Sequence, residues 1–168
     1  MLPFLLKGVN KRRWDWTPEA NPWLGAGDYP AAPFFDFRVS VESQVSFWHI
    51  EEGKGNLLRV VAALAAGRQN PDKFDYVLVG EGIVRTLAIP IRDSGGESAD
   101  PVANERWHCD LVELTGARLV ALIHAIHDHG TFHRVPERQV RELLLSGMHA
   151  SELDQSRMND KLLALLRG

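Results

Sequence analysis

Several features that would place this chain in a special class are missing from its sequence. It contains one cysteine, Cys109, so no disulfide can form within the chain, as is typical of proteins in a reducing compartment. No run approaches the roughly 20 apolar residues of a membrane-spanning helix. Neither sign of charge dominates, with 19 basic and 22 acidic residues. We therefore expect no membrane and no nucleic-acid partner, since nucleic-acid binders depend on an excess of Lys and Arg.

The sequence also lacks the motifs of common enzymes. It has no glycine-flanked serine motif of hydrolases, no dinucleotide-binding glycine motif and no pair of histidines four apart with an intervening glutamate. The segment 53–56, Gly-Lys-Gly-Asn, is not a phosphate-binding loop because no Ser or Thr follows its lysine. The apolar residues 1–6 are too few for a signal peptide, and the basic residues follow them where they should precede. A cytoplasmic protein is expected.

Apolar residues make up 45% and charged residues 24% of the 168 positions, which is the composition of a globular protein. Five of the nine prolines and three of the five tryptophans lie in residues 1–33. We expect this segment to be an irregular arm that packs on the protein through its tryptophans. The remaining residues, 34–168, are expected to form a single domain.

Apolar residues that alternate along the chain predict strands, and apolar residues spaced three or four apart predict helices. Alternating segments predict strands at 35–41 and 45–51, joined as a hairpin, and at 106–114. The nearly continuous apolar run at 74–79 predicts a central strand, and the glycine turn at 80–82 leads from it into a further strand at 83–91. The predicted helices are 56–67, 115–129, 136–147 and 160–166. Together they predict an α+β fold, a single two-layer domain with a mostly antiparallel sheet of about five strands, helices on one face and a C-terminal helical cap.

Four of the seven histidines lie within ten residues, at 124, 127, 129 and 133. Imidazole titrates near neutral pH and binds metals, so this cluster is a candidate site. At 100° per residue, His124 and His127 share a flank of the predicted helix whereas His129 lies on another. Histidines near a helix C-terminus are also favoured there by the helix dipole, and His133 is expected in an exposed loop.

A metal site would need ligands from a second element. The predicted strand 106–114 supplies two residues on one face, and the helix supplies three more. The candidate ligands are His108, Asp110, His124, His127 and Asp128. Nitrogen and oxygen ligands with an open position would suit zinc in a hydrolase, because zinc lowers the pKa of bound water.

A second enzyme hypothesis uses carboxylates of the predicted hairpin. Asp36, Glu52 and Lys54 faintly resemble the layout of metal-dependent nucleases, in which carboxylates hold Mg²⁺ and a lysine assists the attacking water. The proline that usually precedes the aspartate is replaced by Phe35. Residues 140–158 can likewise be compared with a helix-turn-helix, but Ser146 and Ser156 occupy positions that should be apolar.

Apolar surface favours a role without catalysis. The helix 57–67 is apolar on most of its circumference, the arm carries three tryptophans, and the chain closes on four leucines. Such surface is typical of contact with a partner protein or a second copy. We therefore expect a soluble binding or protein-interaction module without catalytic activity, which self-associates or binds a protein partner and needs no cofactor. The alternative is a metal-dependent, zinc-type hydrolase or nuclease.

Overall fold

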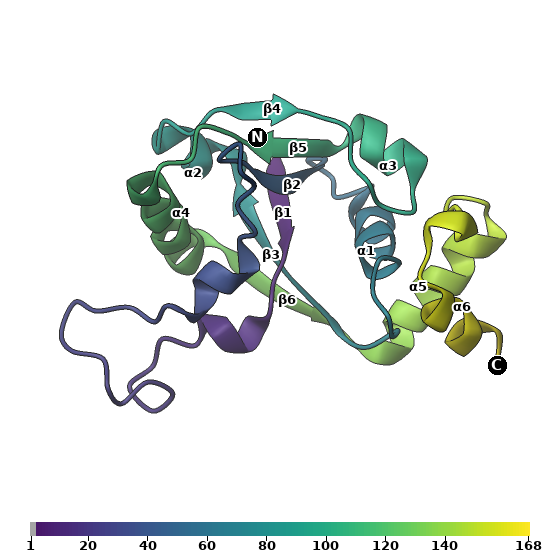
Figure 1. Ribbon diagram of the computed structural model, residues 1–168, viewed down its shortest axis with the longest axis horizontal. Helices are drawn as coiled ribbons and strands as arrows, with labels where there is room; N and C mark the ends of the chain where they lie inside the picture. The colour runs from purple at the N-terminus through teal and green to yellow at the C-terminus, as the bar shows by residue number, and fades with distance from the viewer. Residues whose placement is uncertain (1–2) are drawn as a thin grey trace.

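The computed structural model describes residues 3–168 and contains one antiparallel sheet, with strands in the order β4-β5-β2-β1-β3-β6 (Figure 1). The strands are β1 Phe4–Gly8, β2 Val45–Ile50, β3 Phe74–Gly80, β4 Ile91–Asp93, β5 His108–Leu111 and β6 Thr131–Val135. The predicted α+β class and antiparallel sheet are confirmed. The sheet has six strands where about five were expected.

Helices cover both faces of this sheet. The α-helices are α1 Leu57–Ala65, α2 Glu81–Thr86, α3 Pro101–Arg106, α4 Gly116–His129, α5 Glu137–His149 and α6 Asp160–Arg167, and the 3₁₀ helices are η1 Lys11–Trp14, η2 Ala32–Asp36 and η3 Gln155–Arg157. Helices α1, α3, α5 and α6 share one apolar core with the sheet, and α2 and α4 share the other (Figure 1). The structure thus adds a second helical layer to the one expected.

Strand β3 shows why both faces are covered. Phe74, Tyr76 and Leu78 point into the core beneath α1, whereas Val77 and Val79 point into the core beneath α4. A strand buried on both faces has a continuous apolar run, because neither set of alternating side chains meets water. The run at 74–79 was therefore the sequence signal for two layers of helices.

The centre of the sheet comes from the segment expected to be irregular. Strand β1 pairs with β2 on one side and β3 on the other, with Leu6 opposite both Trp48 and Leu78. Leu5 and Leu6 are fully buried, one on each face. Pro3 directly precedes this five-residue strand. It is tolerated there because its position outside the strand requires no backbone N–H for pairing with a neighbouring strand.

Two predicted strands were wrong. Residues 35–41 form the end of η2 and an irregular stretch leading into a turn, with Phe35 and Val41 exposed. The first half of 83–91 belongs to α2, where Arg85 pairs with Glu81 one helical turn earlier. Alternation predicted the first of these strands and the glycine turn at 80–82 the second, but a segment forms a strand only where a neighbouring strand offers its backbone groups.

The other predicted elements correspond to α1, β2, β3, β5, α4, α5 and α6. Helix α4 begins as predicted, because the Thr115 hydroxyl accepts a hydrogen bond from the Arg118 backbone N–H. The expected exposed loop around His133 was wrong. This residue lies in β6 and stacks on Tyr76, with ring centroids 4.9 Å apart.

Candidate functional site

The strand half of the expected metal site, His108 and Asp110, is buried and forms a polar cluster with two serines. The Ser94 hydroxyl lies 2.9 Å from His108 Nδ1 and donates to Asp110 Oδ2 at 2.7 Å, and the Ser46 hydroxyl donates to Asp110 Oδ1 at 3.0 Å. The Trp48 ring meets the imidazole edge-on at 5.0 Å. Burial lowers the pKa of His108. The hydroxyl, and not the imidazole, stands in the middle of this trio, so the order of a catalytic serine triad is absent from it.

The helix half of the expected site packs against the segment that follows η1. The His127 ring stacks on Trp16 with centroids 3.8 Å apart, and His124 meets Trp16 and Tyr29 edge-on at 5.2 and 4.5 Å. Asp128 accepts a hydrogen bond from His127 Nδ1 at 2.8 Å, which lowers the pKa of this carboxyl. His124 and His127 therefore pack the segment that contains Trp16 and Tyr29 against α4.

The structure does not bring the two halves together. His108 contacts Trp48 in the core beneath α1, whereas α4 covers the opposite face of the sheet. Within residues 3–168, no group of three or more His, Cys, Asp or Glu side chains is arranged to hold a metal ion. The nuclease residue Asp36 is occupied by hydrogen bonds from Arg13 and Trp14. The arrangement thus offers no support for a metal-dependent hydrolase or nuclease.

The apolar surfaces that favoured self-association are largely internal. Helix α1 packs between the sheet and α5, with Val60 and Val61 fully buried and Leu58 half exposed. In α6, Leu162, Leu163 and Leu166 are buried. Across the described part of the chain, no helix is long and apolar enough to cross a membrane. Association with a protein partner stays a prediction.

A basic cavity of about 350 Å³ lies at the end of the sheet where β1 finishes. Its lining has four basic side chains and one acidic side chain, in a protein whose formal net charge is −3. The lining residues are Lys7, Gly8, Val9, Asn10, Arg13, Phe35, Asp36, Arg38 and Arg68. They come from β1, the turn after it, η1, η2 and the residues that follow α1 and η2. The tertiary fold thus brings together charges that are scattered along the sequence.

The single carboxylate of the basic cavity is already engaged. Asp36 Oδ1 accepts from Arg13 Nη1 at 2.6 Å, and Oδ2 accepts from Trp14 Nε1 at 2.8 Å and from the Asn10 backbone N–H at 3.1 Å. Its side chain is 5% exposed. This carboxylate forms an ion pair with Arg13 and anchors η1 to η2, and it forms no ion pair with the other three cations of the cavity.

Those three cations are Lys7, Arg38 and Arg68. Lys7 Nζ donates to the Ser46 carbonyl at 2.9 Å, and Arg68 Nη1 donates to the Lys73 carbonyl at 3.0 Å. Among residues 3–168, no carboxylate lies within ion-pair distance of Lys7, Arg38 or Arg68. Backbone carbonyls satisfy two of the donors but do not neutralise the positive charge.

The pKa values of two cations in the basic cavity reflect their burial. Burial lowers the pKa of Lys7 from 10.5 to about 8; Asp36 and Asp110 act in the opposite direction, and Arg38 lowers the pKa further. Burial also lowers the pKa of Arg68, against the opposite effect of Asp75 and Asp72. Burial destabilises the charged form of a cation that has no ion-pair partner. An anion bound in this cavity would stabilise that charged form.

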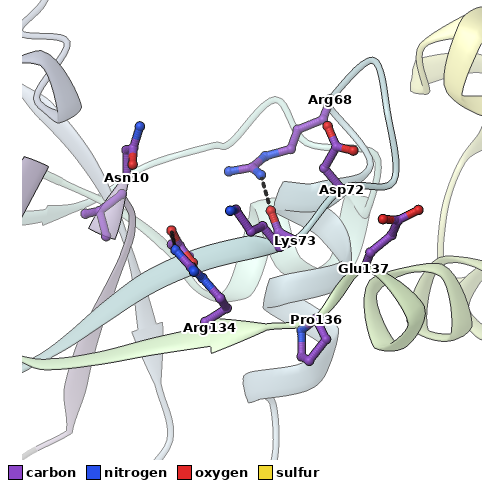
Figure 2. Close-up of a pocket in the computed structure, with 9 residues that line it drawn as sticks. Asn10, Arg68, Asp72, Lys73, Arg134, Pro136 and Glu137 are labelled. Atoms are coloured by element: carbon purple, nitrogen blue, oxygen red, sulfur yellow. Dashed lines mark hydrogen bonds and ion pairs between the residues drawn. The ribbon is translucent and has the colours of Figure 1, made fainter. Parts of the chain in front are cut away.

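A larger neighbouring cavity, of about 750 Å³, shares Val9, Asn10 and Arg68 with the basic cavity. Figure 2 shows Arg68, Lys73 and Arg134 extending into the space between Asn10 and Glu137. Its three basic side chains are balanced by three carboxylates, those of Asp72, Asp75 and Glu137. The neighbouring cavity therefore has no excess charge, and the basic cavity is the better candidate for ligand binding.

Sequence reasoning did not single out the cations of the basic cavity. Lys7 gave one local signal, since it directly follows the apolar residues Phe4, Leu5 and Leu6 of what proves to be a central strand. Arg38 and Arg68 gave none, because only the tertiary fold brings them together.

Fold and site define a protein with a six-stranded sheet between two helical layers and a basic cavity at one end. Comparison with family models, curated proteins and solved structures found no match.

Proposed function

We propose that the protein is a binding module for a small anion that carries a phosphate or carboxylate group. The observation that supports this proposal is the set of three cations, Lys7, Arg38 and Arg68, around the basic cavity without a carboxylate partner. Guanidinium groups offer planar, paired donors that match carboxylate and phosphate oxygens. A ligand of this class would both neutralise the cavity and satisfy its donors.

The size of the basic cavity supports a small ligand. Its volume of about 350 Å³ falls at the lower end of the range for small-molecule sites. Three of its residues, Lys7, Gly8 and Val9, belong to or directly follow the central strand β1. A central strand has little freedom to rearrange, so the backbone that carries Lys7 is held in place before the ligand arrives.

The test uses inorganic pyrophosphate as the probe, with binding measured by titration calorimetry and by the melting temperature. Binding is expected for the unmodified protein and for Arg138→Gln, an exposed arginine paired with Glu142 on α5. Arg38→Gln and Lys7→Met should each weaken binding about tenfold or more, because each removes one positive charge from the cavity that binds the anion. Circular dichroism checks that the variants are folded. Equal binding by all variants, or no binding by the unmodified protein, would overturn the proposal.

A further inference from the structure

We infer that Lys7 is a nucleophile that captures an aldehyde or ketone group of the bound anion as an imine. This inference rests on the proposed function, because the anionic group is what brings the carbonyl carbon to the lysine. The structure contains four other lysines, at positions 11, 54, 73 and 161, and they serve as internal references.

The position of Lys7 suits such a role. It lies in the central strand β1, and its amine is held by the Ser46 carbonyl at 2.9 Å and lies 5.6 Å from the centroid of the Phe47 ring. A neutral amine can donate one N–H to a carbonyl and still present its lone pair to an incoming carbon. Holding the nitrogen at a fixed place beside the bound ligand replaces a bimolecular encounter by an intramolecular one.

The surroundings of Lys7 increase the neutral fraction of its amine. Burial, which is the largest effect, and Arg38 lower the pKa of Lys7 to about 8, whereas Asp36 and Asp110 act in the opposite direction. At pH 7.5 the neutral fraction is thereby about two orders of magnitude higher than for a lysine of pKa 10.5. A lysine desolvated beside another cation is an established way of making this side chain nucleophilic.

The reaction needs no further reactant. The lysine nitrogen forms a bond to the carbonyl carbon, and its two protons pass to the carbonyl oxygen, which leaves as water. A carbon–nitrogen double bond remains, with no change of oxidation state. Arg38 and Arg68 hold the phosphate or carboxylate of the ligand during this step, so the carbonyl group must lie within a few bonds of the anionic group.

The experiment traps the imine with a reductant. The protein is incubated at pH 7.5 with pyridoxal phosphate, which carries both an aldehyde and a phosphate, and is then reduced with sodium borohydride and mapped by mass spectrometry. We expect the adduct at Lys7 at least ten times faster than at the other four lysines. Inorganic pyrophosphate should suppress it, and Lys7→Met should abolish it.

Matched controls separate the amine from the anion site. Lys73→Met removes a lysine of the neighbouring cavity and should leave the Lys7 adduct unchanged. Arg38→Gln should slow the reaction of pyridoxal phosphate several-fold but not that of pyridoxal, which lacks the phosphate. Raising the pH from 7 to 9 should accelerate the Lys7 adduct until the amine is fully neutral.

The outcomes distinguish the two proposals. Saturable binding of pyridoxal phosphate without an adduct at Lys7, or equal modification of all five lysines, would overturn this inference and leave the proposed function standing. An adduct at Lys7 that forms equally fast with pyridoxal and is insensitive to pyrophosphate would support the nucleophile but contradict the anion site. Absence of both binding and adduct would overturn both.

Discussion

Arg134 on the edge strand β6 lies directly opposite Asp75 on β3. Its guanidinium donates a hydrogen bond to each carboxylate oxygen, from Nε to Oδ1 at 2.6 Å and from Nη2 to Oδ2 at 2.9 Å. The same carboxylate accepts the backbone N–H of Lys11 at 3.2 Å. One side chain thus joins an edge strand, an inner strand and the first 3₁₀ helix. Asp75 and Arg134 also line the larger of the two cavities.

Asp75→Asn is expected to lower the free energy of unfolding by about 2 kcal/mol at pH 7, because it leaves the guanidinium without its charge partner and weakens two hydrogen bonds. The hydrogen bond from Arg134 lowers the pKa of Asp75. The stabilisation is therefore present above the unfolded pKa and is lost as the pH falls through the lower folded pKa. Urea unfolding at pH 7 and pH 3 measures this, with Glu142→Gln as an exposed ion-pair control. An Asn variant equally weakened at both pH values would contradict it.

Lys7→Met is expected to raise the free energy of unfolding by about 1 to 2 kcal/mol at pH 7, although it loses the hydrogen bond to Ser46. The folded protein holds Lys7 at a pKa of about 8, below the value of 10.5 for an unfolded chain, so its charge opposes folding below pH 8. This penalty fades between pH 8 and 10.5, and the advantage of the variant should fade with it. Urea unfolding at pH 7 and pH 10 tests the trend. Lys161→Met, on the exposed face of α6, should change little.

Asp100→Ala is expected to destabilise the protein by about 3 kcal/mol. The Asp100 side chain is fully buried, caps α3 through the Ala103 N–H and accepts two hydrogen bonds from Arg59, at 2.5 and 3.1 Å. Removing the carboxylate takes the buried ion-pair partner from the Arg59 guanidinium and removes the N-cap of α3. Thermal unfolding is the measurement. Glu152→Ala removes the other, more exposed partner of Arg59 and should cost under 1 kcal/mol. Similar losses in the two variants would show that burial does not set the strength of these pairs.

Thr115→Ala should lower stability by about 1 kcal/mol, because it removes the oxygen that accepts the Arg118 N–H, one of the free N–H groups in the first turn of α4. Thr115→Ser keeps this oxygen and should retain most of the stability. Hydrogen exchange of the amides in the first turn of α4 would localise the effect. Faster exchange in the Ala variant alone is the expected result, and identical exchange in both variants would argue against capping.

Much of the fold was predictable because its signals are local. The run at 74–79, the capping residue Thr115 and the stripe of apolar residues in α4 each depend on neighbours in the sequence. Strand β1 was missed since five residues next to a proline-rich stretch carry little periodicity. Residues 35–41 were misassigned because alternation says nothing about whether a partner strand is present.

The candidate site was less predictable for the same reason. The histidines attract attention by their density, yet His124 and His127 prove to be packing partners of Trp16. The three cations of the basic cavity are separated by some thirty residues each along the chain, and no local pattern connects them. A site assembled by tertiary contacts leaves no spacing that a single sequence reveals.

The place of β1 at the centre of the sheet has a consequence for how the chain acquires its fold. Both neighbours of β1 lie far along the sequence, with β2 beginning at Val45 and β3 at Phe74. A ribosome must therefore synthesise the chain from β1 through β3 before β1 can be enclosed on both sides. Until then its apolar residues Leu5 and Leu6 have no lasting cover, and the long loops to be closed make sheet assembly slow. The basic cavity, which lies at the end of this strand, depends on the same late enclosure of β1.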